Sequence, residues 1–240
     1  MSKHAVIFGA TSGIGKELAK LLVADDYKVV ITGRRQEKLE ALQAENPEKY
    51  IIKKHDVTDI PSCEVVFKEI VDELKTIDLV VYSSGVGGPN YNLDWDIEYN
   101  TIATNVLGGT KIFGLAYNFF KAQGYGHLVG ISSIAGVRGN RHVPCYFASK
   151  SFMNSYLESL WMKAKRTKNA KIDVTDIVPG FIETKMATGN TFWLASLEKG
   201  TQQIYTAIKK KKKKAYITRR WRLVAIFLRI MPAKVAMKYL

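Results

Sequence analysis

The chain has 240 residues, 47% hydrophobic and 24% charged, a composition that excludes a disordered protein and allows one large α/β domain or two small ones. Its two cysteines, Cys63 and Cys145, are far apart and its four histidines show no ligand spacing, so neither a disulfide framework nor a metal site is expected. The net charge is +14, but residues 209–240 hold twelve Lys or Arg and no acid, which leaves +2 for the first 208 residues.

No apolar stretch reaches the roughly 18 residues that a membrane-spanning helix needs. The chain also enters an apolar run directly after its first four residues, without room for a signal peptide. A cytoplasmic location is therefore expected.

Short apolar runs alternate with longer amphipathic stretches along most of the chain. The short runs predict strands at residues 5–8, 29–32, 50–52, 79–81, 127–131 and 172–178. The longer stretches predict helices at residues 14–24, 37–44, 62–75, from 93 to about 122, 144–165 and 198–208. This alternation indicates a single Rossmann-type, doubly wound parallel sheet with helices on both faces, in which ligands bind beyond the carboxyl ends of the strands.

A glycine-rich turn follows the first predicted strand, with Gly9, Gly13 and Gly15 in the spacing G-x-x-x-G-x-G. Glycines let the backbone turn tightly and approach a pyrophosphate at a helix N-terminus, where free N–H groups and the helix dipole favour anions. The glycines alone are also compatible with a plain strand-to-helix turn. Their position after an N-terminal strand favours a dinucleotide site that includes Ser12 and Ile14.

The second predicted strand ends in Gly33-Arg34-Arg35. A carboxylate at this point would bind a ribose 2′-hydroxyl, whereas two guanidinium groups suit a 2′-phosphate and so favour NADP over NAD. The alternative is a solvated arginine pair that opens the next helix. Asp56, after the third strand, is placed to accept a hydrogen bond from an adenine amino group, although Asp is also an ordinary helix cap.

The spacing of Tyr146 and Lys150 puts both side chains on one face of a helix, one turn apart. A nearby ammonium group stabilises a phenolate and is expected to lower the pKa of Tyr146 towards the working range of an acid or base. A surface Tyr and Lys would have the same spacing. However, Ser133 follows the strand at 127–131, and Asn105 stands midway along the preceding long helix.

In this order and spacing, the glycine turn, Asp56, Asn105, Ser133, Tyr146-x-x-x-Lys150 and Pro179-Gly180 resemble the short-chain dehydrogenase/reductase family over residues 4–186. The resemblance implies that Tyr146 is the proton donor or acceptor and that Lys150 holds the nicotinamide ribose. It implies that Ser133 binds the substrate oxygen and that Asn105 holds a proton-relay water. The implied cofactor contacts further along the chain are Val57, Gly85, Tyr146, Lys150, Pro179, Gly180 and Thr184.

One departure concerns the loop after the fourth strand, where the family usually has Asn-Asn-Ala-Gly and this chain has Tyr82-Ser83-Ser84-Gly85. Gly85 still allows the backbone to lie close to a cofactor, but the side chains that brace the loop differ from those usual in the family.

The resemblance implies an NADPH-dependent oxidoreductase that transfers a hydride between nicotinamide and a carbonyl or alcohol substrate, in a homodimer or homotetramer. The alternative is a catalytically silent nucleotide-sensing or scaffold protein on the same fold. Substrate choice is expected to depend on residues 86–95, 137–143 and 185–200. Within the last range, Met186, Phe192, Trp193 and Leu194 form either an apolar lid over the pocket or an ordinary packing cluster. Either at least one of Arg138, Arg141 and His142 faces an anionic substrate, or the three form a solvated rim.

Residues 1–208 are expected to form the Rossmann-fold catalytic domain, and residues 209–240 a basic and apolar C-terminal extension. Within the extension, a lysine run at 209–214 precedes an edge strand at 215–218 and a short apolar segment at 223–231. Such a segment among cations suits either an anionic membrane surface, with an amphiphilic or lipid-linked substrate, or packing within the domain or on another subunit. Nucleic acid is not expected, because no aromatic platform accompanies the lysines. The membrane alternative would place the enzyme at the inner face of the membrane.

Overall fold

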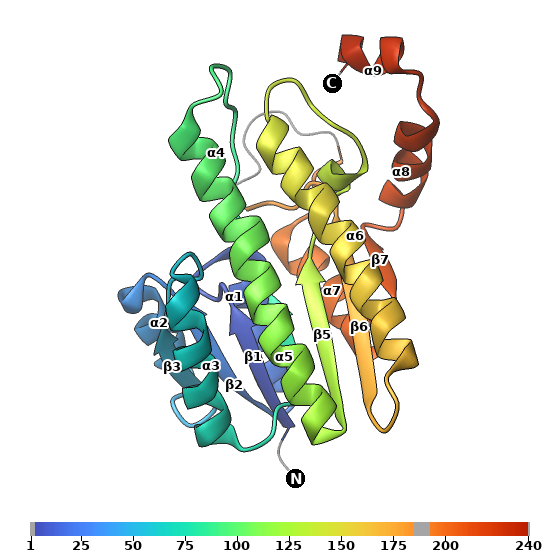
Figure 1. Cartoon of the computed structure of the whole chain (residues 1–240). Coiled ribbons are helices and arrows are strands. Elements are labelled where there is room, and N and C mark those ends of the chain that lie inside the picture. The colour runs from blue at the N-terminus through green and yellow to red at the C-terminus, as the bar shows by residue number, and fades with distance from the viewer. Residues whose placement is uncertain (1–2, 185–192, 240) are drawn as a thin grey trace.

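The computed structural model describes residues 3–184 and 193–239, which form one sheet with helices on both faces (Figure 1). All strand pairs are parallel, and the strand order is β3-β2-β1-β4-β5-β6-β7. The strands are β1 (Lys3–Phe8), β2 (Tyr27–Gly33), β3 (Tyr50–Lys54), β4 (Leu79–Tyr82), β5 (Tyr125–Ile131), β6 (Lys171–Pro179) and β7 (Lys214–Ile217). The predicted doubly wound α/β architecture is confirmed, with its change of winding direction between β1 and β4.

Two helical layers cover the sheet (Figure 1). One contains α3 (Ile60–Leu74), α5 (Gly109–Gln123) and α6 (Pro144–Arg166), and the other contains α1 (Gly13–Ala24), α2 (Gln36–Gln43) and α7 (Leu197–Lys209). Alternate residues of each strand face opposite layers. In β1, Val6 and Phe8 pack with the first layer, whereas Ala5 and Ile7 pack with the second. Both faces of the sheet are therefore buried, which explains why its strands are continuous apolar runs.

The long helix predicted from residue 93 to about 122 is present but interrupted. The α-helix α4 (Trp95–Ile102) continues through a π-helical turn, η1 (Ala103–Gly108), into α5. Gly124, with φ of 92°, ends α5 in the left-handed conformation that glycine tolerates best. Interruptions of the π type occur frequently at functional sites.

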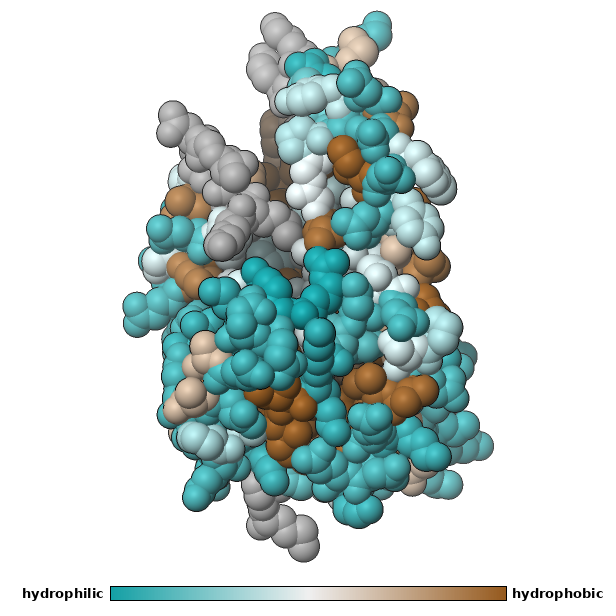
Figure 2. All heavy atoms as spheres, turned by 90° about the vertical axis from the view of Figure 1, so that its left-hand side faces the viewer, coloured by the Kyte–Doolittle hydropathy of each residue, from teal (hydrophilic) through white to brown (hydrophobic). Residues whose placement is uncertain are grey.

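The predicted C-terminal edge strand is observed as β7, which pairs with β6. Beyond it, α8 (Trp221–Ile230) and α9 (Ala233–Tyr239) rise past the carboxyl ends of the strands (Figure 1). Within residues 3–184 and 193–239, every helix is too short or too polar to cross a bilayer. The face over β3, α2 and α3 is mostly hydrophilic (Figure 2).

The lysine run belongs to the folded domain. Four of its six members pair with acids that lie directly after α1, on α6 and on β6. These pairs are Lys209–Asp25 (3.0 Å), Lys211–Asp173 (2.7 Å), Lys213–Glu158 (2.8 Å) and Lys214–Asp176 (3.0 Å). The run therefore fastens α7 and β7 to the domain, and the cations beside the exposed apolar segment are arginines of α8 rather than these lysines.

Candidate active site

The structure brings Ser133, Tyr146 and Lys150 together at the carboxyl end of β5. Ser133 follows the strand and opens a short 3-10 helix, η2 (Ile134–Val137), while Tyr146 lies in the first turn of α6. The Ser133 side chain lies beside the Tyr146 phenol, close enough for its hydroxyl to lower the pKa of the phenol. The Lys150 ammonium lies 5.7 Å from the centroid of the Tyr146 ring. A hydroxyl, a phenol and an ammonium group thus converge where the fold predicts a ligand.

Burial controls the ionisation of this cluster. It lowers the pKa of Lys150 to about 8, an effect that the Asp176 carboxylate opposes. Burial also raises the pKa of Tyr146, although the Ser133 hydroxyl acts in the opposite direction. The lowering that the sequence analysis expects for Tyr146 is not observed, because the phenol is desolvated and Lys150 donates to the carbonyl of Ile131 (3.1 Å).

Asn105 lies in the π-helical turn and is buried. Its Nδ2 donates to the Val86 carbonyl (2.7 Å) and to Ser149 Oγ (2.9 Å), and its Oδ1 accepts from the Val86 N–H (2.9 Å). The side chain therefore connects the loop after β4 with α6. Its role towards a relay water stays a prediction.

The loop after β4 packs closely against the reactive side chains. A Cβ atom on Gly85 would lie 3.3 Å from Lys150 Nζ, and one on Gly87 would lie 2.1 Å from Tyr146 Cδ2. Sequence reasoning did not single out Gly87. The only signal was its place in a glycine-rich loop after a strand.

The departure from the family's Asn-Asn-Ala-Gly pattern has a structural explanation. Tyr82 is buried at the end of β4, and its hydroxyl donates to the carbonyl of Thr104 in the π-helical turn (2.5 Å). A π-helical turn disturbs the regular i→i−4 bonding, so its carbonyls benefit from such side-chain donors. Tyr82 thereby braces the same turn that positions Asn105.

The glycine turn connects β1 with α1. Gly9 has φ of 96°, a conformation that favours glycine, and its backbone lies against Ser84. Helix α1 begins at Gly13 without a side-chain hydrogen bond from Ser12 and without an acid in its first turn. Thr184 lies over this turn, where a Cβ atom on Gly13 would be 3.5 Å from its Cγ2. Ile14 and Gly15 follow in the same first turn, whose N–H groups suit an anion.

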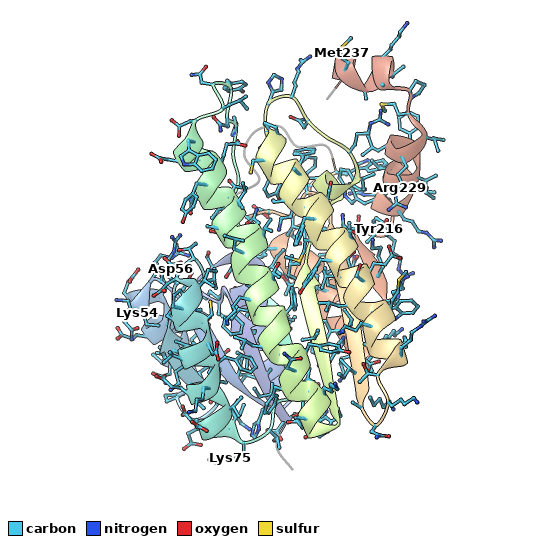
Figure 3. The ribbon with its side chains drawn as sticks, in the orientation of Figure 1. Lys54, Asp56, Lys75, Tyr216, Arg229 and Met237 are labelled. Atoms are coloured by element: carbon cyan, nitrogen blue, oxygen red, sulfur yellow. The ribbon has the colours of Figure 1, made fainter. Side chains whose placement is uncertain are left out.

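The predicted arginine pair lies beside this turn. Arg35 Nη2 donates to Thr11 Oγ1 (2.5 Å) and Ser12 Oγ (2.9 Å). Arg34 Nη1 lies 3.7 Å from Asp56 Oδ2, and Asp56 stands at the carboxyl edge of the sheet next to Lys54 (Figure 3). Burial opposes ionisation of Asp56, but hydrogen bonds from Thr58 and the charge of Arg34 lower its pKa overall.

A surface hollow lies beside this ion pair and is lined by Arg34, Lys54, His55, Asp56, Asp59, Ser62 and Val66. Val57 is buried directly behind it.

The segment after β6 is covered by α8. Pro179 ends β6, and a Cβ atom on Gly180 would lie 2.1 Å from the Trp221 indole. Trp221 is buried and also contacts the rings of Phe181 and Trp193 edge-on. The sequence alone did not predict this role of Trp221, because a contact between residues 180 and 221 leaves no local pattern.

The C-terminal helices also use the two arginines of the turn at 137–143. Arg138 Nη1 donates to the carbonyls of Leu228 (3.1 Å) and Met231 (2.6 Å), and Arg141 Nη1 donates to that of Met237 (3.2 Å). These arginines therefore hold α8 and α9. The sequence had predicted either that they face an anionic substrate or that they form a solvated rim. Of the four residues predicted for an apolar lid, Met186 and Phe192 lie outside the described residues, whereas Trp193 packs against the Trp221 ring and Leu194 is exposed.

Comparisons with known proteins agree with this geometry. A profile of the family described as short chain dehydrogenase matches residues 3–194. An "Uncharacterized oxidoreductase" of Myxococcus xanthus is 33% identical over 195 residues, covering 79% of this chain and 76% of that protein. Carbonyl reductase family member 4 of Xenopus laevis is 33% identical over 190 residues, covering 78% of this chain and 79% of that protein.

Solved structures share the fold. ElxO with NADP bound superposes with a TM-score of 0.80 at 22% identity, covering 90% of this chain and 97% of its own. A short chain dehydrogenase from Burkholderia cenocepacia in complex with NADP gives a TM-score of 0.83 at 17% identity, covering 100% and 98%.

The fold and the matched segment define a Rossmann-fold oxidoreductase. The chain belongs to the short-chain dehydrogenase/reductase family, as its motifs predicted.

Proposed function

We propose that this protein is an NADPH-dependent reductase of a carbonyl compound, with Tyr146 as the general acid. The observation that carries the proposal is the convergence of Ser133, Tyr146 and Lys150 beside the loop that Asn105 holds. Each group suits one part of the reaction, and sequence-distant elements bring all of them to one end of the sheet.

NADP(H) is the proposed cofactor, and it would supply the hydride when bound. Support comes from Arg34 and Arg35, which follow β2 beside the glycine turn at the point where a carboxylate would favour a 2′-hydroxyl. The N–H groups at the start of α1 also suit a phosphate. The hollow beside Asp56 suits an adenine ring. ElxO and the Burkholderia cenocepacia protein were both solved with NADP.

In the proposed mechanism, the Ser133 hydroxyl donates a hydrogen bond to the substrate carbonyl oxygen. The Tyr146 hydroxyl transfers its proton to that oxygen as negative charge develops on it. The Lys150 ammonium orients the cofactor ribose and stabilises the phenolate that Tyr146 becomes. Oxidation of the alcohol reverses these proton movements.

A screen of NADPH oxidation over ketones, aldehydes and keto-sugars tests the proposal. We expect Tyr146→Phe to lower kcat by about 10²- to 10⁴-fold, the usual contribution of a general acid, with NADPH affinity little changed. The competing function is a silent nucleotide-sensing or scaffold protein. NADPH binding without turnover of any carbonyl, and without a difference between wild type and Tyr146→Phe, would favour that function and contradict ours.

We also propose that the substrate is amphiphilic and that α8 contacts an anionic membrane surface at the cytoplasmic side. Leu223, Ile226, Phe227 and Ile230 form an apolar stripe on α8 in which each side chain is at least half exposed. Arg222 and Arg229 are exposed beside the stripe, and Figure 3 labels Arg229 on α8. A short helix with an apolar face and flanking cations is typical of interfacial binding.

Flotation with phosphatidylserine vesicles tests this contact. We expect wild type to float at low salt and Phe227→Ser to float several-fold less, whereas Val65→Ser, at an exposed apolar position on α3, should behave like wild type. Added salt should reduce binding, because it screens the arginines. Wild-type protein that stays unbound at low salt would contradict the proposal.

A further inference from the structure

A buried carboxylate lies next to the candidate active site, and the mechanism above does not use it. Asp176 is in β6 and is 2% exposed. Its Oδ1 lies 2.5 Å from the hydroxyl of Ser132, and its Oδ2 lies 3.0 Å from Lys214 Nζ. Removing a carboxylate from water is costly unless it is paired and hydrogen-bonded, and Asp176 has both kinds of partner.

Ser132 is the point at which this pair acts on the site. The carbonyl of the preceding residue, Ile131, accepts a hydrogen bond from Lys150, and the side chain of the following residue, Ser133, lies beside the Tyr146 phenol and lowers its pKa. Ser132 is also held by Ile177, the residue after Asp176 in β6, whose carbonyl lies 2.8 Å from the Ser132 nitrogen and 2.9 Å from its hydroxyl. A movement of Ser132 would therefore displace both contacts of the reactive pair at once.

We propose that Asp176 is a positioning residue of this site. Paired with Lys214, it fixes Ser132 and the flanking contacts to Tyr146 and Lys150, and its negative charge favours the protonated form of Lys150. The inference rests on the proposed function to the extent that Tyr146 and Lys150 form the reactive pair. It also distinguishes Lys214, the last lysine of the run, by an acidic partner that is almost fully buried.

The groups around Lys150 support the proposal that the charge of Asp176 favours the protonated form of this lysine. Lys150 is faced by Tyr146 from α6, the Ile131 carbonyl from β5, Asn105 from η1 and Asp176 from β6. Of these, Asp176 is the group that raises the pKa of Lys150 against the effect of burial. Asp176 itself is faced by Ser132, Lys214 and Lys150, all of which lower its pKa, whereas burial, the largest effect, raises it.

The test compares Asp176→Asn with Asp173→Asn. Asp173 lies three residues earlier in β6 and pairs with Lys211 (2.7 Å) and Lys165 (3.9 Å). In the control, the same chemical change is made on the same strand and also removes an ion pair with the lysine run. It differs in that Asp173 has no contact with Ser132. Two quantities are measured. The first is the pH profile of kcat/KM for carbonyl reduction. The second is the titration of the Lys150 side chain, followed by NMR in lysine-labelled protein, with the Lys150 signal identified by its absence from the Lys150→Arg variant.

Reduction needs a protonated Tyr146 and a charged Lys150, so activity falls as pH rises through their pKa values. Loss of the Asp176 charge makes the ammonium less favourable and lowers the pKa of Lys150. We expect the alkaline limb and the Lys150 titration to move to lower pH by about one unit in Asp176→Asn, and to stay unchanged in Asp173→Asn. Unmoved curves in Asp176→Asn, or an equal shift in both variants, would overturn the proposal.

Two further variants keep the test decisive. Asp176→Asn combined with Lys214→Met removes both charges together, so that no unpaired ammonium is left should the single variant fail to fold. It is expected to show the same shift. Ser132→Ala keeps the charge but removes the hydrogen bond, and should lower kcat about tenfold without moving the alkaline limb. An unchanged kcat in Ser132→Ala would overturn the positioning role even if no Asp176 variant folds.

The NMR titration separates this inference from the proposed function. A shifted Lys150 titration in a protein that reduces no carbonyl would support the effect of Asp176 and contradict the reductase. Turnover with unshifted curves would support the reductase and contradict the role of Asp176.

Discussion

At the scale of single residues, Gly87 leaves the space that the phenol of Tyr146 occupies. A Cβ atom there would overlap the ring, whereas one on the neighbouring Gly88 would meet nothing within 4 Å. We predict that Gly87→Ala lowers kcat by about 10²-fold, because displacing a reacting group by about 1 Å has an effect of that size. Gly88→Ala is the matched control and should retain wild-type kcat. Equal kcat values for the two variants would contradict the prediction that close packing of Gly87 against the Tyr146 ring matters for catalysis.

The predicted preference for NADPH over NADH depends on Arg35. Its guanidinium already reaches two hydroxyls of the glycine turn, so it stands where a 2′-phosphate would meet the turn. We predict that Arg35→Ala weakens NADPH binding by about tenfold or more, since a charge-assisted bond is lost, and leaves NADH binding nearly unchanged. Fluorescence titrations with both cofactors measure the ratio. A parallel loss for NADPH and NADH would mean that Arg35 only supports the fold.

At the scale of elements, α8 is anchored at its first residue. The Trp221 indole is buried against Gly180, and Arg138 binds the carbonyls at the other end of the helix. We predict that Trp221→Ala lowers the free energy of unfolding by about 3–5 kcal/mol, as expected for a buried tryptophan. Trp95→Ala, at a side chain that is 68% exposed, should change it by less than about 0.5 kcal/mol. Urea unfolding of both variants decides the point.

The elements also show how far the sequence can predict this site. Tyr146 and Lys150 are one turn apart on a helix, and Ser133 and Asp56 follow strands, so regular geometry and known motif order were enough to find them. Asp176, Gly87 and Trp221 were missed. Their contacts join segments far apart in sequence, and a buried acid inside an apolar strand gives no periodic signal before its partner Lys214 is known to lie beside it.

At the scale of the whole molecule, α5 and α6 lie side by side on the outside of one helical layer (Figure 1). Leu107, Phe152 and Met162 are exposed on and near these helices. We predict an oligomer formed through this face, in which case Phe152→Arg should lower the molar mass measured by light scattering. Val65→Arg, on α3, is the control and should leave the mass unchanged. A monomeric wild type would contradict the prediction.

The pairing of Asp176 with Lys214 also affects how the protein is made. While the ribosome is still synthesising residue 214, β6 already contains a carboxylate whose cation has not yet been added, and the sheet lacks its outer strand. An unpaired buried charge costs about 3–5 kcal/mol, a large part of the stability of a typical domain. The nascent chain is therefore expected to reach its final stability only after residues 214–217 have emerged and β7 has paired with β6, so a premature stop codon shortly before the lysines would produce a poorly folded product rather than a merely shortened enzyme.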